Sequence, residues 1–362
     1  QLKEVFRYME SDDLSFVKAE ILNFCKNQEI KRAIMDSVAL LKMGNYDEIK
    51  SNIDTAMKAG ADTDVGLEYK DQVGIRYNEA ARHTITTGWD VIDDLMDGGL
   101  APGELGVVMA PAGIGKSWLL INIAANAVKA GKTVIHYTLE LNQNYVGQRY
   151  DSVLTGIPAQ NLKNYQEDIE EKMKTIAGEL IIKYYPTKST GVMGIKAHIE
   201  KSAMLGKPPD LVIVDYADLL KVNNKKDKHE ALEELYEDLR GMAGEYEIPV
   251  WTASQAGRAS LEDDIIEADK IAASYGKVMV SDFLMSLSRK VEDKLSGTGR
   301  GHVIKNRFGP DGITLPSKIN TNNGQFEFFE PQTTQGKQTT QIMKTGESMI
   351  KKSLAQKFKD LG

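Results

Sequence analysis

The sequence has little cysteine and no long apolar run. Cys25 is the single cysteine in 362 residues, so the chain cannot form an internal disulfide and fits a reducing compartment. No apolar stretch approaches the ~20 residues of a membrane span, and no secretory signal pattern is present. We therefore expect a cytoplasmic protein that does not enter a membrane. The chain opens with Gln1 instead of methionine, which fits a fragment or a processed product.

The chain also lacks an excess of positive charge. Its formal net charge of −7 argues against broad, charge-driven binding of nucleic acid, although it is compatible with a basic channel inside an acidic ring. Hydrophobic residues make up 41% and charged residues 27%, which is ordinary globular composition. A chain of 362 residues is long enough for one large α/β domain and something smaller.

Periodicity divides the chain into four parts. Residues from about Leu14 to Gly60 carry apolar side chains at spacings near 3.6, which predicts helices, the second starting near Asn45. We expect 1–60 to be a helical N-terminal segment and linker helix, 61–83 a polar linker, and 84–330 the main domain. The tail 331–362 is expected to be flexible, with a short amphipathic helix from Ser348.

The main domain alternates strands and helices in the βαβ manner, which predicts a mostly parallel sheet with helices on both faces. In such α/β sheets, ligands bind beyond the carboxyl ends of the strands. The expected strands are Leu105–Met109, Thr133–Leu139, Leu180–Tyr185, Leu211–Asp215, Pro249–Ser254, Phe283–Ser288, Val303–Arg307 and a late hairpin strand Ile313–Leu315; the expected helices are Trp118–Lys129, Gly191–Leu205 and His229–Glu245.

The stretch Ala110-Pro-Ala-Gly-Ile-Gly-Lys-Ser117 lies between an expected strand and an expected helix. A glycine-rich turn at a helix N-terminus aims backbone N–H groups and a helix dipole at one point, which suits a triphosphate. Lys116 would reach the β- and γ-phosphates and Ser117 would ligate Mg²⁺. The usual first glycine of the motif is Ala110 here. The expected ATP-binding residues are Ala112, Gly113, Ile114, Gly115, Lys116, Ser117, Trp118 and Asp215.

Two carboxylates lie at strand ends. Asp215 closes an apolar strand, where an acid is a usual partner of Mg²⁺ in nucleotide hydrolysis. Glu140 follows the strand next in sequence to the phosphate loop and could orient and deprotonate the attacking water, with a solvated strand-end glutamate as the alternative. ATP and Mg²⁺ are therefore the expected substrate and cofactor.

Gln255 and the cations near the end of the domain are further candidates. A strand-terminal glutamine can sense a γ-phosphate and report its loss to the long loop that follows, from Gly257 to Ser281. Lys305 and Arg307 lie one residue apart on an expected strand, so they share a face. They could meet phosphate oxygens of the next subunit as an arginine finger does, or form a surface ion pair; geometry alone leaves both open.

Taken in order, these segments resemble the five motifs of the DnaB-type hexameric replicative helicases, which have RecA-like motors. The resemblance is carried by Ala110–Ser117, Thr138-Leu-Glu140, Val214-Asp-Tyr216, Ala253-Ser-Gln-Ala-Gly-Arg258 and Lys305-Asn-Arg-Phe-Gly-Pro-Asp-Gly312. It implies that Glu140, Lys116, Gln255, Lys305 and Arg307 are catalytic, the last two acting on the neighbour's ATP. It also implies a phage member of the family, which would work in the cytoplasm of the host.

The same resemblance implies loops that hold single-stranded DNA inside a homo-hexameric ring. The matching segments run from about Lys221 to His229 and from Asp269 to Lys277, and the first is rich in lysine, as a phosphate-tracking surface would be. A charge run is otherwise a solvated surface. The expected DNA contacts are Lys221, Asn223, Lys225, Lys226, Lys270, Ser274, Tyr275, Gly276 and Lys277.

The function that the resemblance implies is an ATP-driven, ring-forming DNA helicase that moves 5′ to 3′ on single-stranded DNA. The alternatives are a RecA- or RadA-type strand-exchange ATPase and a KaiC-like regulatory ATPase without a DNA role. Primase, a helicase loader or a single-strand-binding protein are candidate partners of the N-terminal segment or the C-terminal tail. The terminal helix could equally pack on its own domain.

Overall fold

The structure is a computed structural model that describes residues 27–38, 40–41, 45–58, 69–70, 82–222, 227–257, 260, 263–267 and 276–360. The chain divides into two units, Gln1–Ala81 and Arg82–Gly362. In the first unit, residues 27–38 are helical and α3 spans Tyr46–Lys58. The second unit begins two residues before the predicted boundary at 84 and contains the sheet.

Within the described residues, nine strands form one sheet in the order β3-β2-β4-β5-β1-β6-β7-β8-β9. The strands from β3 to β6 in this order are all parallel, and β7, β8 and β9 are antiparallel. This confirms the predicted α/β fold with a mostly parallel sheet. The strands are β1 (Leu105–Ala110), β2 (Thr133–Thr138), β3 (Glu179–Tyr184), β4 (Leu211–Asp215), β5 (Val250–Gln255), β6 (Phe283–Ser288), β7 (Thr298–Asn306), β8 (Thr314–Ile319) and β9 (Phe326–Phe328).

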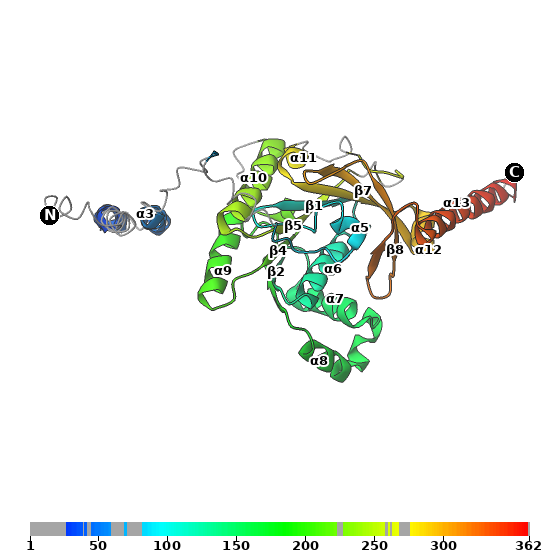
Figure 1. Cartoon of the computed structure of the whole chain (residues 1–362), viewed down its shortest axis with the longest axis horizontal. Helices are drawn as coiled ribbons and strands as arrows, with labels where there is room; N and C mark the ends of the chain where they lie inside the picture. Colours follow the sequence, from blue (N-terminus) through cyan, green and yellow to red (C-terminus); the bar gives the residue numbers. More distant parts are fainter. Residues whose placement is uncertain are drawn as a thin grey trace. The chain divides into compact units, whose positions relative to one another are not determined.

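Helices cover both faces of the parallel part of the sheet (Figure 1). Successive residues of a strand point to opposite faces, so Leu211 and Ile213 of β4 join one hydrophobic cluster while Val212 and Val214 join the other. The first cluster is completed by α6 (Lys116–Lys129) and α7 (Gln143–Thr155), and the second by α9 (Val192–Met204) and α10 (Lys228–Tyr246). The buried apolar runs of the central strands follow from this double cover.

Several elements differ from the sequence-based expectation. The elements that were not expected are α7, β9, α5 (Asp90–Asp93), η2 (Ala159–Asn164), α8 (Gln166–Lys174), η3 (Ala217–Leu219), α11 (Gly276–Val280) and α12 (Val291–Ser296). Strand β7 begins at Thr298, before the predicted start at Val303. The prediction missed the first half of the strand because that half contains Gly299 and Gly301, and glycine weakens the sequence signal of a strand. A Cβ at Gly301 would lie 2.7 Å from the ring of Phe328, so the glycine allows β9 to pack closely.

The hairpin of β8 and β9 supports the phosphate loop. Gly324 in its turn lies against the indole of Trp118, where a Cβ would come within 1.9 Å of the ring. The Asn122 side chain donates to the carbonyl of Gly324 at 2.7 Å, and the Trp89 indole N–H donates to the carbonyl of Phe326 at 2.8 Å. The hairpin therefore fixes the start of α6, which carries the phosphate-binding residues.

The tail differs most from its prediction. Residues expected to be flexible belong to one helix, α13, which spans Thr334–Asp360. The side-chain oxygen of Thr333 accepts a hydrogen bond from the N–H of Gly336 at 3.1 Å, which is an N-cap contact, and Met343 is buried on the helix. Capping and packing thus stabilise a segment of low apolar content. Among the described residues, no helix combines the length and the apolar character that crossing a membrane requires.

Candidate nucleotide site

The phosphate loop lies between β1 and α6, at the carboxyl edge of the sheet. Gly113 and Gly115 have φ values of 75° and 120°, which side-chain-bearing residues rarely adopt. Ala110 is the last residue of β1 and has no positive φ, so alanine fits where the usual motif has glycine. No side chain caps the first turn of α6, so its backbone N–H groups remain available to an anion.

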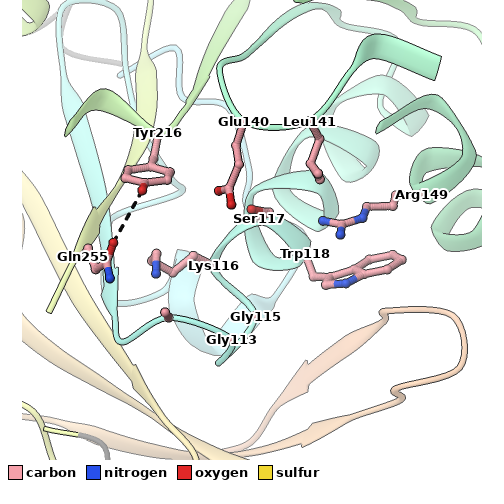
Figure 2. A pocket seen from close by; sticks show the side chains of 11 residues that line it. Gly113, Gly115, Lys116, Ser117, Trp118, Glu140, Leu141, Arg149, Tyr216 and Gln255 are labelled. Carbon is pink, nitrogen blue, oxygen red and sulfur yellow. Dashed lines mark hydrogen bonds between the residues drawn. The ribbon is translucent and has the colours of Figure 1, made fainter. Parts of the chain in front are cut away.

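A cavity of about 330 Å³ opens at this loop (Figure 2). It brings together residues from five segments: the loop itself, the end of β2, helix α7, the end of β4 and the end of β5. The lining residues are Ala112, Gly113, Gly115, Lys116, Ser117, Trp118, Glu140, Leu141, Arg149, Tyr216 and Gln255. Ile114, also expected to bind nucleotide, is buried beneath the loop and does not line this cavity.

Ser117 and Asp215 form the oxygen pair expected for Mg²⁺. The Ser117 hydroxyl donates to Oδ1 of Asp215 at 3.1 Å, and Asp215 is 3% exposed. Burial raises the pKa of Asp215 to about 6, while the hydrogen bond from Ser117 opposes this shift. Mg²⁺ prefers oxygen ligands and usually takes one or two from a protein beside phosphate and water, so the two residues suit this ion.

Lys116 is held inside the loop. Its ammonium donates to the carbonyl oxygens of Ala110 at 2.9 Å and Pro111 at 3.1 Å. Burial lowers the pKa of Lys116, and the nearby carboxylates of Asp215, Asp218 and Glu140 oppose the shift. A buried cation whose partners are neutral carbonyls is well suited to exchange them for phosphate oxygens.

Glu140 follows β2 and Gln255 ends β5, and both line the pocket from strands that β4 separates in the sheet. The carboxylate of Glu140 points toward Ser117 in Figure 2, while Gln255 lies on the opposite wall. The hydroxyl of Tyr216 donates to Oε1 of Gln255 at 3.5 Å, a long contact that a phosphate oxygen could replace. The structure thus collects the predicted Lys116, Ser117, Glu140 and Gln255 in one pocket, and their roles in hydrolysis stay predictions.

Arg149 lines the same pocket and was not anticipated. Its guanidinium lies 4.9 Å from the Trp118 ring centroid and 5.2 Å from that of Tyr145, and its Nε is buried without a hydrogen-bond partner among the described residues. The residue belongs to α7, a helix that the sequence did not predict. The spacing of Glu140 and Arg149 in the sequence does not indicate that the two side chains share a pocket, because their proximity depends on how α7 packs over the phosphate loop.

Lys305 and Arg307 lie at the other edge of the sheet. Because β7 is antiparallel, its last residue, Asn306, pairs with Phe283, the first residue of β6. Arg307 donates to Oδ1 of Asp282 at 2.9 Å, and Oδ2 of Asp282 accepts the N–H of Leu105, the first residue of β1. The five steps from Leu105 to Ala110 span about 17 Å at about 3.3 Å each, which separates Arg307 from its own phosphate loop.

The cluster around Asp282 is well satisfied. Arg240 of α10 donates to both carboxylate oxygens, at 3.0 and 3.1 Å, beside the bond from Arg307. The ammonium of Lys305 donates to the carbonyl of Met279 at 2.7 Å, and burial together with Arg307 lowers the pKa of Lys305. Arg307 lies just past β7, which ends at Asn306, so a shared face on that strand stays a prediction, and the ion pair of Arg307 is made within the chain.

Most of the predicted DNA contacts lie outside the described residues, namely Asn223, Lys225, Lys226, Lys270, Ser274 and Tyr275, as does Arg258. Lys221 is described and exposed. Gly276 and Lys277 are buried at the start of α11, and the Lys277 ammonium bonds to Asp218 at 2.7 Å. The expectation that Lys277 touches DNA is corrected by this position, because burial against a carboxylate removes the cation from the surface.

The fold and the pocket define a P-loop nucleotide-binding protein with a RecA-like sheet. Residues 84–267 match the family described as the DnaB-like helicase C terminal domain, which is half of the chain. The chain belongs to this family and is a DnaB-like helicase, an ATP-hydrolysing enzyme, as predicted from the sequence.

Relatives with known names agree with this assignment. The chain is 23% identical over 324 residues to the DnaB-like replicative helicase of Enterobacteria phage T4, a match that covers 85% of this chain and 67% of the relative. It is 27% identical over 208 residues to the replicative DNA helicase DnaB of Geobacillus stearothermophilus, covering 54% of this chain and 45% of the relative. The chain therefore spans about two thirds of the phage relative and about half of the bacterial one.

Two solved structures share the fold. The structure of a DnaB-like replicative helicase and its interactions with primase superposes with a TM-score of 0.68 at 16% identity, covering 88% of this chain and 80% of the other. A second structure, of an ATPase domain, superposes with a TM-score of 0.63 at 19% identity and covers 74% of this chain and 100% of the other. At these identities the likeness concerns the fold.

Proposed function

We propose that this chain is the motor of a ring-forming DNA helicase that hydrolyses ATP, moves 5′ to 3′ on single-stranded DNA and separates the duplex ahead. The ring is a homo-hexamer, and a phage-type member works in the host cytoplasm. Primase, a helicase loader and a single-strand-binding protein are the candidate partners of the N-terminal segment and the C-terminal tail.

One observation carries the ring: the predicted trans cations are separated from their own pocket by the length of β1. Arg307 is anchored through Asp282 to the amino end of that strand, whereas Lys116 lies just beyond its carboxyl end. Arg307 therefore cannot reach a nucleotide held by its own phosphate loop. A neighbouring copy in a head-to-tail arrangement brings the amino edge of one sheet against the carboxyl edge of the next.

Within the pocket, each residue has a distinct task. Lys116 exchanges its carbonyl partners for phosphate oxygens, and Glu140 orients and deprotonates the attacking water. Ser117 and Asp215 would hold Mg²⁺, which would supply positive charge opposite the phosphate oxygens. Gln255 donates to the γ-phosphate and loses that partner after hydrolysis. Arg307 and Lys305 of the neighbour stabilise the charge that develops in transfer.

Mixed rings test this division of labour. Glu140→Gln chains lack the base and Arg307→Ala chains lack the finger, so each should be inactive by itself. At an equal ratio, roughly one quarter of the interfaces pair an intact Glu140 with an intact Arg307, and turnover should recover toward that fraction. Phosphate release is measured across a series of ratios. Turnover that never exceeds the sum of the two separate proteins would refute shared sites.

Unwinding of a forked duplex tests the helicase function itself. The substrate carries a labelled strand and a 5′ single-stranded tail, and release of that strand should require ATP and the tail. A substrate with only a 3′ tail is the matched control for direction. An enzyme that exchanges strands without separating the fork, or that hydrolyses ATP with equal speed in the absence of DNA, would contradict the proposal.

A further inference from the structure

A buried ion pair lies directly behind the nucleotide pocket, and the hydrolysis scheme does not use it. The Lys277 side chain is 2% exposed, and its ammonium donates to Oδ1 of Asp218 at 2.7 Å and to the hydroxyl of Ser254 at 3.1 Å. The ring of Tyr236 lies beside the same ammonium, 5.1 Å from its centroid. Lysine is rarely buried to this degree, because removing two charges from water costs more than burying an apolar pair of the same size.

Asp218 is the centre of this group. Its Oδ1 accepts bonds from Lys277 and from the hydroxyl of Tyr236 at 3.1 Å. Its Oδ2 accepts the backbone N–H of Gln255 at 3.2 Å and the Ser254 hydroxyl at 3.4 Å. One carboxylate thus joins the end of β5, the middle of α10 and the start of α11. A half-satisfied carboxylate would be unfavourable here, so its partners must shift together.

On the nucleotide side, the group is bonded to the pocket wall itself. Asp218 follows the metal-site residue Asp215 by three positions, in the short helix η3. Gln255, whose backbone Asp218 holds, lines the pocket with its side chain. A displacement of Gln255 on binding or loss of a γ-phosphate therefore changes the position of the hydrogen bond that Asp218 accepts.

On the other side, Asp218 is bonded to α11, the helix that follows predicted DNA contacts in the chain. Lys277 lies in the first turn of α11, which begins at Gly276, directly after residues 268–275 in the sequence. Gly276 is pressed against α10, since a Cβ there would lie 2.2 Å from Cδ of Glu233. The contact with Glu233 and the ion pair to Asp218 leave α11 little freedom to move without the carboxylate.

We propose that the Asp218–Lys277 ion pair is a positioning device that couples the state of the nucleotide, read through Gln255, to the placement of α11, which directly follows the predicted DNA contacts Ser274 and Tyr275 in the chain. The proposal rests on the helicase function proposed above. Neither Asp218 nor Lys277 is among the described residues that line the nucleotide pocket. Separating the charges inside the protein is unfavourable, so the pair transmits displacement instead of absorbing it.

The experiment compares Lys277→Met with Lys196→Met. Methionine preserves the length of the side chain and removes the charge. Lys196 forms an ion pair with Glu245 at 2.6 Å between α9 and α10, away from the pocket, and serves as the matched control. Phosphate release is measured with and without oligo-dT, and oligo-dT affinity is measured with and without a non-hydrolysable ATP analogue.

We expect Lys277→Met to retain basal ATPase activity within about twofold while its stimulation by oligo-dT falls at least about fivefold, the lower end of ordinary coupling between sites. The effect of the ATP analogue on oligo-dT affinity should fall by a similar factor. Lys196→Met should keep both properties. A Lys277→Met enzyme that is stimulated like the wild type and still links nucleotide to DNA affinity would overturn the proposal.

Asp218→Asn provides a second variant should Lys277→Met fold poorly. It keeps an oxygen for the Gln255 N–H and removes the charge, and we expect the same loss of stimulation. Adding Lys277→Met to Asp218→Asn should cause little further loss, because both act on one contact. Additive losses would contradict a shared role. A wild-type enzyme that ignores oligo-dT would instead refute the helicase function, so the two failures are distinguishable.

Discussion

The charged groups at the two edges of the sheet differ in how completely they are hydrogen-bonded. At the carboxyl edge, the Lys116 ammonium donates to two carbonyls of the phosphate loop, and Gln255 has a long contact with Tyr216. At the amino edge, the Asp282 carboxylate accepts bonds from Arg240, Arg307 and a backbone N–H. The first edge has bonds that a ligand could replace, and the second has a complete cluster.

The difference fits two separate proposed tasks: the carboxyl edge binds ATP, and the amino edge assists hydrolysis at a neighbour's site. Groups that must receive ATP hold weak partners that phosphate can displace, so binding needs little rearrangement. In the proposed trans role, Arg307 needs a defined starting position, and its bond to Asp282 supplies one. If Arg307 turned toward a neighbour's phosphate as proposed, Arg240 would still balance the buried carboxylate, so its departure would not leave an isolated charge.

The largest expected effect contrasts Lys116→Ala with Arg307→Ala, one from each edge. Both should lower turnover by roughly 10³-fold or more. Lys116→Ala should also weaken ATP binding by about 100-fold, because a charge-assisted contact is lost in the ground state. Arg307→Ala should leave binding within about threefold. Binding of a fluorescent ATP analogue beside phosphate release checks this, and equal loss of binding in both variants would erase the distinction between the edges.

The second prediction concerns the anchor itself. Asp282→Asn should lower the free energy of unfolding by about 3 kcal/mol, because two arginines lose a buried charged partner. Asp264→Asn is the matched control, since Asp264 also pairs with an arginine, Arg300, but is 58% exposed, and it should cost less than about 1 kcal/mol. Urea unfolding of both variants gives the comparison. Similar losses of unfolding free energy in the two variants would show that burial of the Asp282 carboxylate adds nothing to its stabilising effect.

The third prediction concerns the core between the edges. His136 is fully buried, its Nδ1 contacts the Tyr150 hydroxyl at 2.7 Å, and burial lowers its pKa to about 3. The unfolded chain takes up a proton below about 6.5 and the folded chain does not, so stability falls as pH drops from about 6.5 toward 3. Between pH 7 and 4.5 the loss should be about 2 to 3 kcal/mol.

His136→Gln keeps a hydrogen-bonding group beside Tyr150 and cannot titrate, so this part of the acid sensitivity should disappear. Thermal melting from pH 7 to 4.5 compares the slope of stability against pH in the two proteins. An unchanged slope would mean that His136 takes up its proton at the same pH in the folded and the unfolded chain, so that burial does not lower its pKa.

The smallest effect is expected in α13, away from both edges. Thr333→Ala removes the N-cap contact to Gly336 and should lower the free energy of unfolding by about 1 kcal/mol with unchanged ATPase activity. Thr345→Ala is the control, because that hydroxyl only bonds back to the Gln341 carbonyl within the helix. If the control costs as much as the cap variant, the cap at the start of this helix has no energetic role of its own.

Much of the fold could be predicted because the central strands are short apolar runs with clear ends. Leu211–Asp215 and Phe283–Ser288 agree with the prediction at both ends. The misses have local causes. The prediction missed the first half of β7 because it contains glycines. It missed α13 as a continuous helix because the segment is polar and its start depends on one threonine cap. Arg149 could not be assigned because α7 must first fold over the phosphate loop.

The phosphate loop and the acid at the end of β4 could be predicted from the sequence, because those features depend on neighbouring residues and on strand ends. The position of Arg307 at the far edge and the burial of Lys277 depend on how distant parts of the chain pack together. The Arg307–Asp282 contact joins residues 25 apart, and the Lys277–Asp218 contact joins residues 59 apart. Such pairings follow from strand direction and helix packing, which no local pattern encodes.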